Sequence, residues 1–181
     1  MATKEKVKFP LSPIGRVSFP SVFEPTAMSE GQDKKYSVTL LFPKGTDLKS
    51  LKELAKKTAS EKWPKGLPAN FRTPFRDGGE KEQLDGYEEG VTFVKFSGKY
   101  KPEVIDQKKQ PIGADDFYAG CWARLTYTCY AYDNSGNKGV AFGLVNIQKA
   151  RDDEPFGLGS SSADDDFEEL AVDEELAALL D

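Results

Sequence analysis

The clearest pattern in the chain is an alternation of side chains between residues 121 and 132. Odd positions, such as Cys121 and Leu125, are mostly small and apolar, whereas even positions carry aromatic, hydroxyl and basic groups. A period of two predicts a β-strand with one face toward a core and the other toward solvent or a ligand. Residues 140–149 predict a second strand, and Asp-Asn-Ser-Gly-Asn at 133–137 predicts a hairpin turn between the two.

The remaining apolar positions predict one helix and several shorter strands. Residues 48–62 repeat leucine and alanine at helical spacing, and Asp47 in front of them predicts an N-cap. Residues 64–90 are rich in proline, glycine and charge, which predicts a long loop. Aromatic and β-branched residues favour four further strands, at 16–23, 35–42, 91–96 and, more weakly, 103–105.

These elements predict a mainly β protein with five or six strands and one helix after the second strand. Strands and helices do not alternate as they do in parallel α/β folds, so a small, curved antiparallel barrel is the natural closure. We therefore expect an OB-fold-like five-stranded antiparallel barrel with one inserted helix. An immunoglobulin-like sandwich would contain more strands and lack such a helix.

Charge is segregated along the chain. Residues 1–151 hold all 25 lysines and arginines with 18 acids, a net charge of +7, whereas residues 152–181 hold 12 acids and no base. A basic body with an acidic tail is typical of a protein that binds a polyanion, although a tail of this kind can also serve only solubility. The composition predicts a basic N-terminal arm (1–14), a folded OB domain (15–151) and an acidic linker with a disordered C-terminal tail (152–181).

The sequence lacks the residues that most enzymes and metal sites require. It contains no histidine, which removes the commonest general base and the commonest zinc ligand. It contains neither a glycine-rich phosphate loop nor a nucleophile motif. No apolar stretch approaches the ~20 residues of a membrane span, and the N-terminus has no hydrophobic signal region. We therefore expect a non-enzymatic cytoplasmic protein with no cofactor, no metal and no membrane contact.

Aromatic and cationic side chains occur together in three segments, namely 71–76, 95–101 and the even positions of 122–132. Single-stranded nucleic acid fits this combination, because bases stack on rings while lysine and arginine hold phosphates. The alternative is that the loop or the helix covers these rings as a second core layer. The candidate stacking residues are Trp122, Tyr130, Tyr132, Phe75 and Tyr100. The candidate phosphate-binding residues are Arg72, Arg76, Lys95, Lys99, Lys101 and Arg124.

The acidic tail carries regularly spaced apolar residues among its carboxylates. Such a segment is typical of one that folds against a groove of a partner, and a nonspecific acidic tail is the simpler alternative. The candidate partner-binding residues are Asp164, Asp165, Asp166, Phe167, Glu168, Glu169, Leu170, Leu176 and Leu180.

The chain resembles a family of bacteriophage single-stranded DNA-binding proteins, most clearly over residues 117–157, FYAGCWARLTYTCYAYDNSGNKGVAFGLVNIQKARDDEPFG. The resemblance implies an OB-fold domain that coats single strands without sequence preference during phage DNA replication, recombination and repair in the bacterial host. It also implies that the acidic tail competes with DNA and contacts replication proteins. Many tails of this family end in an acidic and aromatic tip, whereas this chain places Phe167 internally and ends Leu179-Leu180-Asp181.

The expected partners are therefore single-stranded DNA and, through the tail, replication or recombination proteins, with a monomer or homodimer as the assembly. A strand-annealing recombination mediator would share the DNA binding but assemble into rings or filaments. A virion or scaffold protein would bury the aromatic face against another subunit and bind no oligonucleotide. A carboxylate-dependent nuclease would cleave DNA with a divalent metal.

Overall fold

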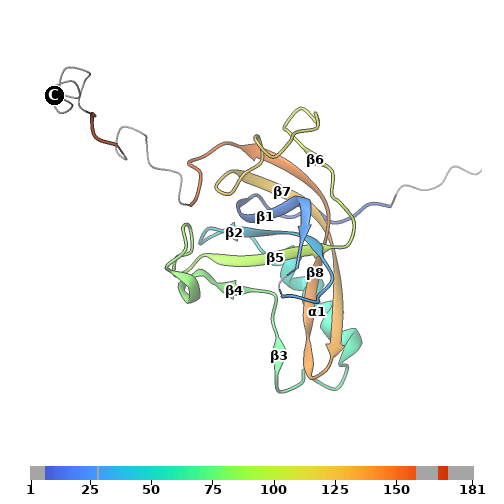
Figure 1. Ribbon diagram of the computed structural model, residues 1–181. Coiled ribbons are helices and arrows are strands. Elements are labelled where there is room, and N and C mark those ends of the chain that lie inside the picture. The colour runs from blue at the N-terminus through green and yellow to red at the C-terminus, as the bar shows by residue number, and fades with distance from the viewer. Residues whose placement is uncertain (1–6, 28, 158–166, 171–181) are drawn as a thin grey trace, which may run out of the picture.

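Five strands close into a ring at the centre of the described structure (Figure 1). The structure is a computed structural model that describes residues 7–27, 29–157 and 167–170. Around the ring, β1 pairs with β2, β2 with β5, β5 with β8, β8 with β7, and β7 again with β1. The pairing of β5 with β8 is parallel and the other four are antiparallel, so the predicted OB-type barrel is confirmed with one parallel contact. The five strands are β1 (Gly15–Thr26), β2 (Lys35–Phe42), β5 (Thr92–Gly98), β7 (Trp122–Asn134) and β8 (Asn137–Arg151).

Shorter elements surround this ring. The helix α1 (Lys49–Lys62) lies between β2 and β5 in the sequence, as predicted. Within the predicted loop 64–90, by contrast, the chain forms β3 (Phe71–Arg72), β4 (Arg76–Asp77) and the 3-10 helix η1 (Gly78–Lys81). β3 pairs with β8 and β4 with β5, so this segment is tied to the barrel rather than free. β6 (Val104–Ile105) pairs with the C-terminal part of β8, whereas β3 pairs with its N-terminal part.

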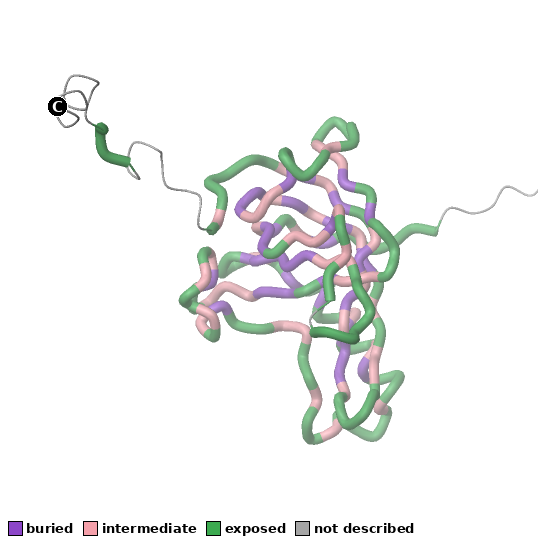
Figure 2. Tube along the Cα trace, viewed as in Figure 1, coloured by how far each residue is buried: buried purple, intermediate pink, exposed green. Residues whose placement is uncertain are grey.

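The alternating residues of β7 build the barrel interior, as the sequence predicts. Leu125 and Tyr127 are about 1% exposed, and the rings of Tyr127, Phe96 and Phe142 pack with centroids 5.4–5.9 Å apart. Figure 2 shows the resulting band of buried residues along the central strands. α1 adds Leu51 and two alanines to this core, because its apolar residues recur at helical spacing.

A smaller cluster covers the outer face of β2 and β5. Leu41, Tyr87 and Phe93 are buried there, and Phe156 packs against them from beyond the last strand. β2 is therefore buried on both faces, which explains why its C-terminal half reads as a continuous apolar run.

Two local predictions differ from the structure. α1 begins at Lys49 with Leu48 as N-cap, so the predicted capping role of Asp47 is wrong by one position, although its carboxylate accepts a hydrogen bond from the Lys49 N–H at 3.0 Å. The N-terminal arm, which is expected to precede the folded domain, is partly packed against it, because Ser12 is buried and exchanges backbone and hydroxyl hydrogen bonds with Leu125 of β7. A strand edge offers unpaired N–H and C=O groups, and the arm satisfies some of them.

The β7–β8 hairpin is longer and tighter than predicted. Asn134 pairs with Asn137, so only Ser135 and Gly136 form the turn, with φ angles of 50° and 86°. Positive φ at both central residues is the geometry of a type I′ turn, which matches the twist of the flanking strands. The hairpin extends beyond the barrel beside β3 and α1 in Figure 1.

Residues 152–157, which we call the docked segment, return to the barrel after β8. The Phe156 N–H donates to the Ala119 carbonyl at 2.9 Å, and the Gly157 N–H donates to the Asp85 carboxylate at 2.9 Å. Gly120 gives this segment room, because a Cβ there would lie 2.4 Å from the Glu154 carbonyl oxygen.

Gly120→Ala is expected to lower the free energy of unfolding by about 1–3 kcal/mol. The added methyl group would meet the docked segment, and φ at Gly120 is 113°, where side chains are strained. Denaturant unfolding measures the change. Gly113→Ala is the control, because a Cβ there meets nothing and φ is not positive. Equal effects of the two substitutions would show that the docked segment is not held at Gly120.

Candidate nucleic-acid interface

Three adjoining hollows form one groove over β2 and β5, which we call the basic groove. Lys35, Lys95 and Ser97 line its centre and are shared between neighbouring hollows, so the three are continuous. The tyrosine end contains Phe9, Lys99, Tyr100, Lys101 and Tyr130. The Phe19 end contains Phe19, Arg76, Lys81, Tyr87, Phe93 and Tyr132.

The groove is strongly cationic. Its described lining residues include six lysine or arginine side chains and one carboxylate, that of Asp33. Burial lowers the pKa of Lys95 below its usual value, and the nearby charges of Lys35 and Lys81 lower it further. Like charges held this close are stabilised by an anion between them, so the groove is suited to phosphate groups.

Exposed rings stand at the tyrosine end. Tyr100 is 86% exposed and Tyr130 is 42% exposed, although burying either ring would remove a large apolar area from water. Tyr130 comes from the outward face of β7, and Tyr100 follows the end of β5 beside Lys99 and Lys101. Rings next to cations in an open hollow can stack unpaired bases while the cations hold the backbone.

Phe19 marks the other end and was not predicted from the sequence. Its φ is 46°, an unusual value for a residue with a side chain, and it lies where the pairing of β1 with β2 shifts register between Ser18 and Ser21. The irregularity turns the ring outward, where it is 59% exposed and 6.5 Å from the ring of Tyr87. Such strain costs of order 1–3 kcal/mol and is common at functional sites. Pro20 signals the irregular strand, but no sequence pattern signals the exposed ring.

The groove brings together seven of the residues proposed from the sequence. Tyr130 and Tyr132 come from one strand, and Tyr100 approaches from another segment. The Arg76 guanidinium is paired with Glu80 at 2.8 Å and lies 5.1 Å from the centre of the Phe93 ring. The seven are Tyr100, Tyr130, Tyr132, Arg76, Lys95, Lys99 and Lys101.

The other four do not line the groove. Phe75 packs edge-on against Phe142 at 5.8 Å and anchors its own loop, and Arg72 lies on β3 beside the hairpin. The Arg124 Nε donates to the Gln148 side chain at 3.0 Å. Trp122 starts β7, ten residues and roughly 33 Å from Tyr132 at strand rise, so the shared outward face does not make a shared site.

Of the proposed tail residues, only Phe167, Glu168, Glu169 and Leu170 are described, and all four are exposed. Asp164, Asp165, Asp166, Leu176 and Leu180 lie outside the described residues. The role of the tail therefore stays a prediction.

Residues 11–177 match the model of the family described as Enterobacter phage Enc34, ssDNA-binding protein. The chain belongs to this family. It is also 36% identical over 173 residues to protein p50 of Acyrthosiphon pisum secondary endosymbiont phage 1, an alignment that covers 88% of this chain and 92% of that protein. The predicted resemblance is confirmed. Membership in a family of non-enzymatic DNA-binding proteins also confirms that the protein is not an enzyme.

Solved structures of similar proteins share the fold of this family member. The single-stranded DNA-binding protein from bacteriophage Enc34 in complex with ssDNA has a TM-score of 0.68 at 24% identity, covering 81% of this chain and 88% of that one. The single-stranded DNA-binding protein gp2.5 of bacteriophage T7 has a TM-score of 0.58 at 16% identity, covering 91% of this chain and 99% of that one. At these identities the matches establish the barrel, not individual contacts.

Two further properties concern only the described part of this family member. Its helix is neither long nor apolar enough to cross a membrane. Across residues 7–27, 29–157 and 167–170, no three histidine, cysteine, aspartate or glutamate side chains gather where they could hold a metal ion.

Proposed function

We propose that this family member binds single-stranded DNA in the basic groove, with bases stacked at both of its ends. The observation that carries the proposal is the coincidence of six cations and several exposed rings in one continuous groove. Tyr100 and Tyr130 stack bases at one end, and Phe19 and Tyr132 do so at the other. The six cations that line the groove hold the phosphates: Lys35, Arg76, Lys81, Lys95, Lys99 and Lys101.

This arrangement favours a single strand over a duplex and does not select a sequence. Stacking on a protein ring requires an unpaired base, and every base has a flat face that contributes about 1–3 kcal/mol. Phosphate contacts carry no direct sequence information. We therefore infer sequence-independent coating of single strands, as phage DNA replication, recombination and repair in the host cytoplasm require.

Binding of labelled oligonucleotides, followed by fluorescence anisotropy, tests the proposal. Neither tryptophan lines the groove, so a label on the DNA is a better probe than intrinsic fluorescence. Single strands of thymidine and of cytidine are expected to bind within about tenfold of each other, and a duplex much more weakly. Equal affinity for duplex and single strand would contradict stacking in the groove.

We also propose that the acidic tail competes with DNA. Three of the twelve tail acids belong to the docked segment, which leaves nine beyond Gly157. Removing residues 158–181 is expected to tighten binding of single strands at low salt, with the gain fading as salt screens the charges. Equal affinities of the full and shortened chains at every salt concentration would exclude competition.

DNA binding is expected to take up protons at alkaline pH below 10.5, the ordinary pKa of lysine. The pKa of Lys95 is lowered in the free protein by burial and by Lys35 and Lys81. A phosphate in the groove favours the charged form and raises this pKa again, so affinity falls as pH rises through the lowered value. Calorimetry in two buffers of different ionisation enthalpy measures the uptake. Lys95→Gln should reduce it, and an unchanged uptake in this variant would contradict the assignment.

A further inference from the structure

A second cluster of cations and rings lies at the end of the barrel where β1, β7 and β8 meet. The Arg151 guanidinium lies 4.6 Å from the centre of the Trp122 ring, and the Arg16 guanidinium lies 6.0 Å from it. The Lys149 ammonium lies 5.2 Å from the Tyr118 ring. We call these five residues the Trp122 cluster. Flat rings beside cations are the same chemistry that suits the basic groove to single strands.

Carboxylates of the docked segment occupy this cluster. Asp153 accepts a hydrogen bond from the Trp122 indole N–H at 2.7 Å and lies 3.8 Å from the Arg16 guanidinium. Asp152 pairs with the Lys149 ammonium and accepts a hydrogen bond from the Tyr118 hydroxyl at 2.7 Å. The indole hydrogen bond is the main reason that the pKa of Asp153 lies below its usual value, so this carboxylate is charged at neutral pH.

These carboxylate oxygens bind as phosphate oxygens of a nucleic acid would bind. Charge-assisted hydrogen bonds from guanidinium, ammonium and indole groups accept either anion. Asp152 and Asp153 are consecutive, so two negative charges meet the cluster side by side.

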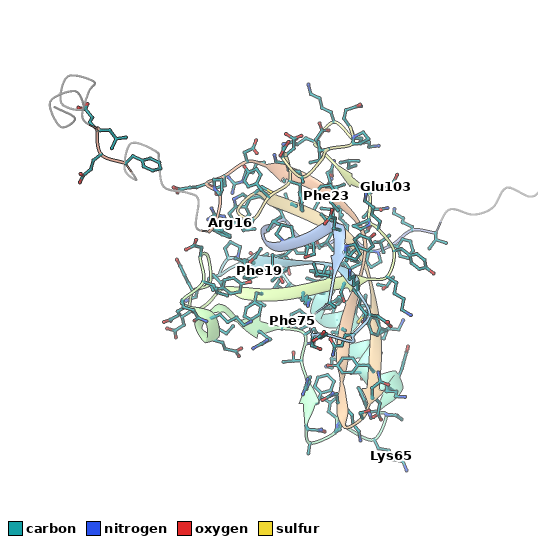
Figure 3. All side chains as sticks on the ribbon, viewed as in Figure 1. Arg16, Phe19, Phe23, Lys65, Phe75 and Glu103 are labelled. Carbon is teal, nitrogen blue, oxygen red and sulfur yellow. The ribbon has the colours of Figure 1, made fainter. Side chains whose placement is uncertain are left out.

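The cluster is continuous with the basic groove. Phe19 and Tyr87 line the Phe19 end and also a neighbouring, mainly apolar hollow, which Ala119 and Phe156 line as well. The one carboxylate among the described residues of this hollow, that of Asp85, accepts a hydrogen bond from the Gly157 N–H of the docked segment. The Arg16 guanidinium lies 4.2 Å from the centre of the Phe156 ring, so this hollow reaches the Trp122 cluster. Figure 3 shows Arg16 and Phe19 on the same strand, with Arg16 beside the exit of the chain toward the C-terminus.

We propose that the Trp122 cluster is a second single-stranded DNA site, which Asp152 and Asp153 occupy as phosphate mimics until a long strand displaces them. The inference rests on the proposed function of the groove, which a strand fills first. A strand longer than the groove leaves past Phe19, crosses the apolar hollow and exchanges its phosphates for the two carboxylates. Short strands fill only the groove, so the footprint on DNA grows with strand length.

The double variant Asp152→Asn, Asp153→Asn tests this site, because asparagine keeps the shape and removes both charges. Affinity is compared for oligothymidines of about 8 and about 30 nucleotides, the shorter within the footprint of one OB fold. The long strand is expected to bind about tenfold tighter, because its phosphates no longer have to displace two carboxylates. Its plot of log affinity against log salt is expected to steepen by about 1.4, because the two phosphate contacts no longer replace contacts that the protein makes with itself. The short strand is expected to bind as it does to the unaltered protein.

Glu53→Gln with Glu61→Gln is the matched control, because it removes two exposed charges on α1, away from both sites. It should leave the difference between the two strand lengths unchanged. An equal gain for short and long strands in the asparagine variant, or no gain for the long strand, would overturn the second site.

Arg151→Ala supplies an independent readout, because this exposed side chain stacks on Trp122. In the asparagine variant it should cancel the gain for the long strand, and in the unaltered protein it should weaken binding of the long strand only. If the asparagine variant does not fold, Arg151→Ala in the otherwise unaltered protein still tests the site. An equal loss of affinity for the short and the long strand would then contradict the second site. Failure of the short strand to bind the unaltered protein would instead refute the groove.

Discussion

Tyr100→Ala with Tyr130→Ala is expected to weaken binding of single-stranded DNA by about 2–4 kcal/mol, or roughly 30- to 1000-fold. Both rings are exposed in the tyrosine end of the groove, 86% and 42% respectively. Neither belongs to the buried core, so the variant should fold normally. The loss arises because two bases no longer stack, and anisotropy with an oligothymidine measures it.

The matched control is Tyr100→Phe with Tyr130→Phe, which keeps both rings and removes only the hydroxyl groups. Its affinity should stay close to that of the unaltered protein, because stacking depends on the flat ring. If the phenylalanine variant loses as much affinity as the alanine variant, the hydroxyl groups rather than the rings bind DNA. If neither variant loses affinity, the tyrosine end is not part of the interface.

Lys35→Ala with Lys95→Ala is expected to weaken binding about a hundredfold at low salt and scarcely at all near 1 M salt. Both lysines line the centre of the groove, and their proximity helps to lower the pKa of Lys95. Loss of two phosphate contacts on a single strand lowers the slope of log affinity against log salt by about 1.4. A salt series of binding curves gives this slope directly.

Lys52→Ala with Lys56→Ala is the control for net charge. These lysines are exposed on α1, outside the basic groove, and their loss changes the charge of the protein by the same amount. The control should leave the slope nearly unchanged. An equal decrease in both variants would mean that overall charge, not the groove, determines affinity.

The strands and the helix are predicted well from the sequence, because the spacing of apolar residues reflects which face of each element is buried. The alternation along β7 correctly separates Leu125 and Tyr127 from the outward Tyr130, since a strand that borders a core must alternate. The helix is predicted for the same reason, because Leu51 and Ala55 recur at helical spacing. The parallel contact of β5 with β8 is not predictable in this way, because periodicity does not say which strands become neighbours.

The site is predicted only in part, because residues on the same face of a long strand can lie far apart along it. Trp122 and Tyr130 both point outward from β7, but Trp122 lies at the start of this long β-strand and Tyr130 lies near its end. Phe75 has the same local composition as a stacking residue, yet it packs against Phe142. Phe19 is exposed by a backbone irregularity that only the tertiary pairing of β1 produces.

Photo-crosslinking tests the central claim most directly, that bases stack on the rings of the basic groove. A strand of about 8 nucleotides that contains 5-iodouracil fits within one OB-fold footprint and reacts with rings in contact with the base. The crosslinked residues are then located by mass spectrometry. We expect crosslinks at Tyr100 or Tyr130 and at Phe19 or Tyr132. Crosslinks confined to rings outside the groove, such as Trp63 or Tyr118, would contradict the account.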